Sequence, residues 1–240
     1  MADPCFFPFT VPKEILLPKQ LNDPFGAEIP EVAKLAAKEV QAYLEQHQAD
    51  WLHDFEGSRG KMFGVLVVED KSGKMGYLST FSGKMRDLPH PKVFVPSLFD
   101  LSVNDNFLTV GMLKIGEMKR QIESETSSAK IAELSKARKK FSIALQKELF
   151  DQYVFLNAQG TSKSLYDIFA DFNGKKPPSG AGECAAPKLL QYAFEQQMKP
   201  LAIAEFWWGK SPPSEAKQHL AYYPACKDKC RPILSYMLGD

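Results

Sequence analysis

The chain has 240 residues, of which 44% are hydrophobic and 25% charged, and a formal net charge of +1. This composition allows a large buried core in one domain or two, and the near-neutral charge argues against a globally basic nucleic-acid-binding protein. No apolar run reaches the ~18 residues that a membrane helix needs, and the start of the chain lacks a basic secretion signal, so we expect a cytoplasmic protein without a membrane partner. In that reducing compartment the four cysteines indicate buried thiols or a metal site rather than disulfides.

The first part of the chain predicts an extended arm, a helix and a β-hairpin. Prolines are too dense in residues 1–29 for a helix or a central strand, yet the apolar residues between them predict an arm laid on the domain surface. A helix is expected from Pro30 to about Gln46, and strands are expected over Lys61 to Glu69 and Met75 to Ser82. Because the first strand is apolar throughout, helices should cover both of its faces.

Residues 106–156 have a different, charge-rich and helical composition. Hydroxyl residues cluster over Ser124 to Ser128, where one can cap a second helix. We therefore predict an antiparallel helical hairpin, inserted in a single α/β domain that residues 1–105 and 157–240 form together.

The last part of the chain alternates helices and strands. We expect helices over Ser164 to Phe172, about Cys184 to Gln196 and about Ala225 to Leu238, with a loop over residues 173–182 and a strand from Pro200 to Trp207. Together with the β-hairpin, these elements predict an α/β fold with a mixed sheet flanked by helices.

Three of the four cysteines stand where helices should begin. Cys184 opens one predicted helix, and Cys226 and Cys230 open the last. This element order is similar to that of the zinc-dependent cytidine deaminase fold, whose two cysteine-bearing helix starts supply three zinc ligands. The resemblance implies a zinc site on Cys184, Cys226 and Cys230, with His219, or the carboxylate of Glu183 or Glu205, as a fourth ligand. The alternative is that the thiols are buried side chains selected for their size; a disulfide between Cys226 and Cys230 is disfavoured in the cytoplasm.

Two features depart from the deaminase pattern. Ala186 stands where that family has its catalytic Glu, so a zinc-bound water would lack its proton shuttle. Three residues separate Cys226 from Cys230, where the family has two, although positions i and i+4 still share one face of a helix. A hydrolase, an inactive remnant and a structural ion all stay open.

The same region combines basic and aromatic residues, as RNA-binding surfaces do. The alternative is that the lysines solvate the surface and the tryptophans belong to the core. The candidates for RNA contact are Lys175, Lys176, Lys188, Trp207, Trp208, Lys227, Lys229 and Arg231.

Several segments resemble the amino-terminal extension of bacterial RluA-type RNA pseudouridine synthases. They are Cys5 to Thr10, Gly60 to Val68, Phe81 to Lys84, Gly180 to Leu190, Ala204 to Gly209, and Tyr223 to Cys226 with Cys230. The resemblance implies a coiled-coil segment matching residues 106–156 and a separate, C-terminal catalytic domain that isomerises uridine in structured RNA.

The family's catalytic aspartate lies in a His-Arg-Leu-Asp motif that this sequence lacks. We therefore expect no catalytic residue for that reaction here, and interpret the chain as an accessory domain, excised or standing alone, that binds or positions rRNA or tRNA. Two alternatives are a zinc-binding deaminase-like domain and a protein-interaction module that uses the helical hairpin.

Overall fold

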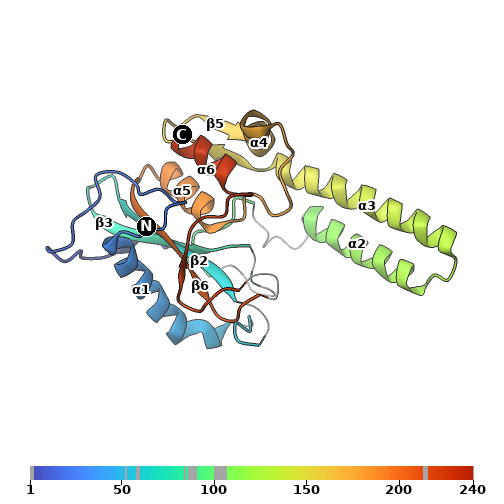
Figure 1. Ribbon diagram of the computed structural model, residues 1–240, viewed down its shortest axis with the longest axis horizontal. Coiled ribbons are helices and arrows are strands. Elements are labelled where there is room, and N and C mark those ends of the chain that lie inside the picture. Colours follow the sequence, from blue (N-terminus) through green and yellow to red (C-terminus); the bar gives the residue numbers. More distant parts are fainter. Residues whose placement is uncertain are drawn as a thin grey trace.

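The computed structural model describes residues 3–51, 53–57, 60–83, 85, 91–99, 107–212 and 216–239. Lys84, at the end of one resembling segment, and the predicted domain boundary at residues 105 and 106 lie outside the described residues. The described chain forms a five-stranded sheet with helices against it, and a pair of long helices that extends away from the sheet (Figure 1).

The sheet is antiparallel at every described strand pair. Its strands, in spatial order, are β1 (Phe7–Pro8), β3 (Met75–Phe81), β2 (Lys61–Glu69), β6 (Lys199–Trp208) and β7 (Tyr222–Tyr223). The predicted mixed sheet is therefore wrong in its strand directions. After the helical region the chain returns as β6, which lies beside β2 and not beside β3. Both β3 and β6 pair antiparallel with β2, so β3 and β6 run in the same direction.

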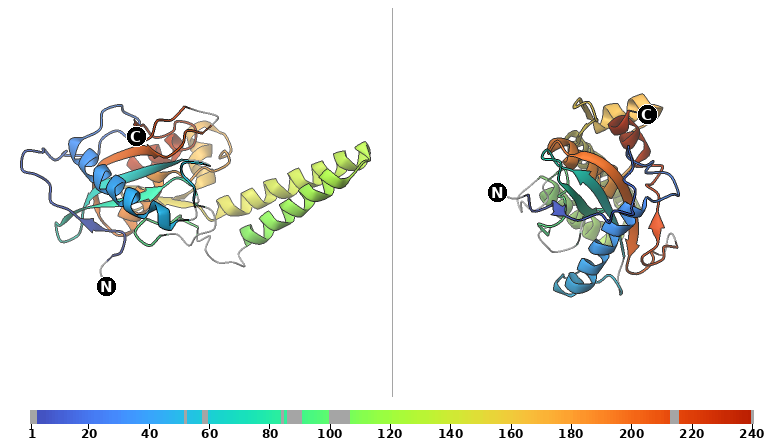
Figure 2. Two further views of the ribbon diagram at one scale, coloured as in Figure 1. Left: turned by 90° about the horizontal axis from the view of Figure 1, so that it is seen from below. Right: turned by 90° about the vertical axis from the view of Figure 1, so that its left-hand side faces the viewer.

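Neighbouring side chains of β2 enter two different cores. Val65 packs with the apolar stripe of α1 (Glu31–His47), whereas Leu66 packs in the core that contains residues of α5 (Ala185–Glu195) and α6 (Arg231–Leu238). Figure 2 shows α1 on one side of the sheet and the other two helices on the opposite side. The prediction that helices cover this strand on both faces is confirmed. The strand reads as an unbroken apolar run because both of its pleated faces are buried.

The N-terminal arm lies against the domain, as predicted. Phe7 pairs with Tyr77 at the edge of the sheet, and the two rings stack with centroids 5.4 Å apart. Pro30 then occupies the N-cap position of α1, where its missing amide costs no helical hydrogen bond.

Two long helices, α2 (Phe107–Ser124) and α3 (Ser128–Asp151), pack against each other and project from the sheet (Figures 1 and 2). Gly111 lets α2 approach Leu145 of α3 closely, because the side chain of Leu145 fills the space that a Cβ would need. Between Phe107 and Asp151 the large apolar side chains Val110, Met112, Leu113 and Ile143 are exposed.

Between α3 and α5 the chain forms elements that the sequence did not predict. The short strands β4 (Val154–Leu156) and β5 (Ser162–Ser164) form a separate two-stranded sheet before α4 (Leu165–Asn173). A single turn of 3-10 helix, η1 (Gln48–Asp50), also follows α1. Residues 154–156 thus pair as a strand and do not continue the preceding helix.

Gly64 of β2 allows α5 to lie close to the sheet. A Cβ at this position would stand 2.8 Å from Cβ of Ala185, which immediately follows Cys184. We therefore expect Gly64→Ala to lower the unfolding free energy by about 1–3 kcal/mol, because a packed core must shift. In urea unfolding, Gly116→Ala is the matched control: its Cβ would meet only Arg120, at 3.8 Å, and it should stabilise α2 by about 1 kcal/mol. Equal effects of the two substitutions would contradict this account of Gly64.

Candidate metal centre

Three thiols meet where two helices begin. Cys184 is the N-cap residue of α5, and Cys230 is the N-cap residue of α6. Cys226 lies in the turn before α6, in which the amide of Cys230 donates to the Cys226 carbonyl oxygen at 3.3 Å. The last helix thus begins later than predicted, with Pro232 in its first turn, where proline is tolerated.

The three sulfur atoms are close enough to share one ion. Sγ of Cys226 lies 3.3 Å from Sγ of Cys230 and 3.9 Å from Sγ of Cys184, and all three lie within 4.8 Å of one another. All three are free thiols; Cys230 is buried, Cys184 half-buried and Cys226 exposed. Tetrahedral geometry with zinc–sulfur bonds of ~2.3 Å places sulfur atoms ~3.8 Å apart. The cluster could therefore hold a metal ion with only small movements.

The thiols influence one another's ionisation. Side-chain contacts with Cys184 and then with Cys230 lower the pKa of Cys226, so that its thiolate is the favoured anion. Contacts with Cys184 and then with Cys226 raise the pKa of Cys230, and the contact with Cys226 raises the pKa of Cys184. One thiolate in the cluster thus makes ionisation of a second thiol less favourable. A divalent cation would offset this repulsion, because cysteine binds metal ions as the thiolate.

Two buried ionisable residues flank the cluster. Oε1 of Glu205, on β6, accepts the amide of Ala186 at 2.9 Å, and burial raises the pKa of this carboxyl group to about 7. Nζ of Lys188, on α5, donates to the carbonyl oxygen of Phe81 at 2.5 Å, and burial lowers the pKa of this amine to about 8. Buried groups with displaced pKa values beside potential metal ligands are typical of functional sites.

His219, one of the three candidates for a fourth ligand, does not belong to the group of potential ligands that the described residues form. Its Nδ1 accepts the amide of Gly209 at 2.9 Å, and among the described residues the group of potential ligands contains only the three cysteines. His219 is thus held at Gly209, four residues beyond Glu205 on the chain. Four residues of extended chain span ~13 Å, so His219 is bound at a point well along the strand from Glu205, which flanks the thiols. The other sequence candidate, Glu183, accepts the hydroxyl of Tyr153.

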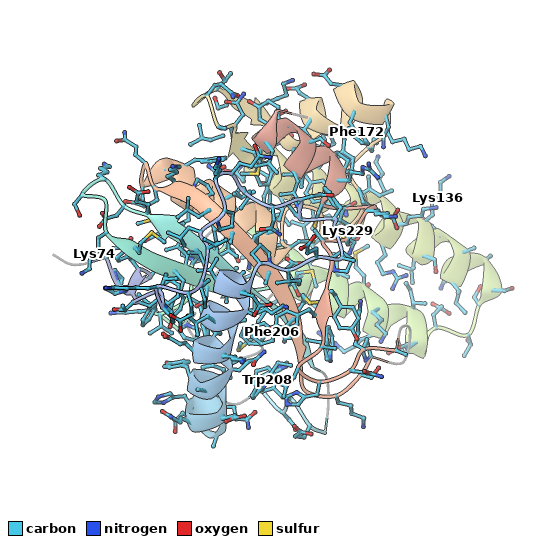
Figure 3. The ribbon with its side chains drawn as sticks, turned by 60° about the vertical axis from the view of Figure 1, so that its left-hand side comes forward. Lys74, Lys136, Phe172, Phe206, Trp208 and Lys229 are labelled. Atoms are coloured by element: carbon cyan, nitrogen blue, oxygen red, sulfur yellow. The ribbon has the colours of Figure 1, made fainter. Side chains whose placement is uncertain are left out.

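Three of the residues predicted to contact RNA belong to the interior instead. Trp208 and Lys188 are each 1% exposed, and Trp207 is 8% exposed. Both indole N–H groups are satisfied internally, Trp207 by the carbonyl of Gly209 at 3.0 Å and Trp208 by Gln48 at 3.0 Å. Trp208 lies with Phe206 on the α1 side of β6 (Figure 3). Lys188 is buried because α5 packs against the sheet and α6, whereas the two tryptophans are buried on β6, so none of the three presents its side chain at the surface.

Of the other basic candidates, Lys227, Lys229 and Arg231 adjoin Cys226 and Cys230 in the sequence. Lys227 and Lys229 lie between Cys226 and Cys230, and Nζ of Lys229 would be 3.3 Å from a Cβ on Gly180. The turn therefore lies against the loop over residues 173–182, which carries two further lysines. The side chains that are exposed are Lys175, Lys176, Lys227 and Arg231, and Lys229 is half-buried.

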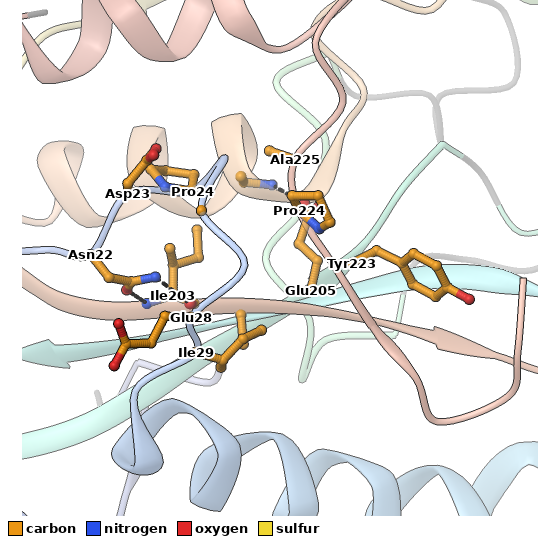
Figure 4. A pocket seen from close by; sticks show the side chains of 13 residues that line it. Asn22, Asp23, Pro24, Glu28, Ile29, Ile203, Glu205, Tyr223, Pro224 and Ala225 are labelled. Carbon is orange, nitrogen blue, oxygen red and sulfur yellow. Dashed lines mark hydrogen bonds between the residues drawn. The ribbon is translucent and has the colours of Figure 1, made fainter.

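The N-terminal arm fixes the chain just before Cys226. The carbonyl of Pro24 accepts the amide of Ala225 at 2.9 Å, and the side-chain amide of Asn22 bonds the backbone of Ile203 on β6 at 2.8 and 3.2 Å. These residues line a pocket together with Glu205 (Figure 4). Proline density predicted an arm but carried no signal for this contact.

None of the three comparisons with known proteins, made against family models, curated proteins and solved structures, gives a match. Over the described residues, no helix combines the length and the apolar character that crossing a membrane requires.

Proposed function

We propose that this chain is a zinc-binding accessory domain that holds structured RNA for a pseudouridine synthase. The observation that carries the proposal is the convergence of Cys184, Cys226 and Cys230 at the starts of α5 and α6. Thiolate-rich sites with tetrahedral geometry suit zinc, which three cysteines would hold with a fourth position open.

The arrangement of elements supports a deaminase-like framework for this site. With the elements between β3 and α5 set aside, the chain order is α1, β2, β3, α5, β6, β7 and α6, and this order supports the comparison with that fold. The α2–α3 hairpin is inserted after β3, together with β4, β5 and α4. Ala186 offers no carboxylate where a deaminase has its acid–base residue, and its amide is occupied by Glu205. These features favour a structural ion over a hydrolytic one.

A structural ion would fix the basic turn. Lys227 and Lys229 lie between two of the ligands, and Lys229 lies against Gly180 in the loop that carries Lys175 and Lys176. Because the tryptophans are buried, the candidates that remain at least partly exposed here are the lysines and Arg231, which outnumber the one exposed acid of the turn, Asp228. Such positive charges bind the phosphate backbone with little sequence preference. The resemblance to pseudouridine synthases makes rRNA or tRNA the expected ligand, and the absence of a His-Arg-Leu-Asp motif assigns isomerisation to a separate catalytic domain.

Neutralising the turn should weaken RNA binding and flatten its salt dependence. We expect the zinc-loaded chain to bind tRNA with an affinity that falls steeply between 50 and 200 mM salt. The double variant Lys227→Ala with Lys229→Ala should reduce the magnitude of the slope of log K against log salt by about 2, because each phosphate contact contributes about 0.9 to that slope. Fluorescence anisotropy measures both quantities. Lys71→Ala with Lys74→Ala, in the exposed turn between β2 and β3, is the control. Identical slopes for the two double variants, or no binding by the wild-type chain, would refute RNA binding at the turn.

A further inference from the structure

Lys188 is a buried ammonium group that lacks an ion-pair partner among the described residues. Its side chain is 1% exposed, and Nζ donates to the Phe81 carbonyl at 2.5 Å and lies 5.4 Å from the centre of the Phe81 ring. No described carboxylate lies within 4.0 Å of this nitrogen. A buried charge is costly unless an opposite charge compensates it, so the sequence retains Lys188 at a considerable cost.

Three nearby acidic groups could compensate the positive charge of Lys188. Burial lowers the pKa of Lys188, and the groups that oppose this effect are Glu183, Cys184 and Glu205. Cys184 lies one turn before Lys188 on α5, at the spacing that places both side chains on one face of the helix. The charged side chain therefore lies on the same side of α5 as the thiol that this helix contributes to the cluster.

The two carboxylates are poor counter-ions. Glu183 receives hydrogen bonds from Tyr153 and, at 3.2 Å, from Ser97. Glu205 receives the amide of Ala186, and burial raises its pKa to about 7, so that the carboxyl group is substantially protonated at neutral pH. A divalent ion bound by three thiolates, in contrast, has a net charge of −1, which a single ammonium group neutralises.

We propose that Lys188 is the counter-ion of the tris-thiolate metal centre, a positioning residue that raises the affinity of the three cysteines for the metal. This inference rests on the proposed zinc binding. It explains why an uncompensated lysine is retained in the interior: without metal it destabilises the fold, and with metal it balances the site.

Lys188→Met should have opposite effects on the two forms of the protein. Methionine nearly preserves the shape of the side chain and removes its charge, so the metal-free chain should melt at a higher temperature than the wild type. Zinc affinity should fall 10- to 100-fold, the range seen when groups that support metal ligands are lost. Competition with a chromophoric chelator measures the affinity, and thermal unfolding with excess chelator measures the metal-free stability. A lysine that served only to bond Phe81 would instead stabilise the metal-free chain.

Two further variants make the test decisive. Lys188→Gln keeps a donor for the Phe81 carbonyl without the charge, and it should lose zinc affinity as Lys188→Met does, including where the methionine variant does not fold. Lys199→Met, an exposed lysine at the start of β6, should change neither quantity. Wild-type zinc affinity in either Lys188 variant would overturn the counter-ion assignment alone. A wild-type chain that binds no zinc would end the proposed zinc binding and this inference with it.

Discussion

Cys184→Ser should abolish zinc binding, reducing the metal content of natively purified protein from about one ion per chain to none. Cys184 supplies the ligand from α5, while Cys226 and Cys230 come from one turn, so its thiol is the only one of the three that ties the two helix starts together. A serine hydroxyl does not ionise at neutral pH and cannot replace a thiolate ligand. Because the binding energy of a structural metal is folding energy, the variant should also lose about 4 kcal/mol of stability at free zinc concentrations of 1,000 Kd.

Cys5→Ser provides the matched control. Cys5 is also buried, but its thiol donates to the carbonyl groups of Lys92 and Phe94, at 3.4 and 3.5 Å, and it does not belong to the cluster. This variant should retain one zinc per chain, whatever its effect on packing. Zinc retained by Cys184→Ser, or lost equally by both variants, would show that the three thiols do not form the site.

Hydrophobic periodicity was sufficient to predict the frame of the domain. The stripe of α1 and the unbroken apolar run of β2 gave both elements and the burial of β2 on two faces. Strand direction was not predictable, because it depends on which neighbour β6 selects. The strands β4, β5 and β7 span only two or three residues, too few for an alternating pattern to appear.

The thiol cluster was predictable because Cys184 and Cys230 stand at helix starts and Cys226 lies in the turn that leads into the second of these helices. The surroundings of the cluster were not predictable from residue type. Lysine and tryptophan are usually surface or half-buried residues, yet Lys188 and Trp208 are enclosed. Their burial follows from tertiary packing: α5 is covered by the sheet on one side and by α6 on another, and β6 pairs with β2. The spacing of Cys184 and Lys188 on one helix face was the available signal.

Glu205→Gln should remove a pH dependence from the stability of the metal-free chain. The pKa of Glu205 is raised from 4.5 to about 7 in the folded protein, so between these values the folded chain binds a proton that the unfolded chain has released. As the pH rises across this window, the contribution of Glu205 to the wild-type unfolding free energy should therefore decrease by about 1.4 kcal/mol per pH unit. The full stabilisation is present below pH 4.5 and is lost above pH 7.

Glutamine imitates the protonated carboxyl group and keeps the acceptor for the Ala186 amide. The variant should match the wild type below pH 4.5 and exceed it by about 3 kcal/mol at pH 8, as the full displacement of the pKa requires. Urea unfolding with excess chelator at four pH values measures the difference, and Glu45→Gln on the exposed face of α1 should leave the wild-type curve unchanged. Parallel stability curves for the wild type and Glu205→Gln would mean that Glu205 is ionised at little cost, and an ionised Glu205 would then compete with the metal centre for the charge of Lys188.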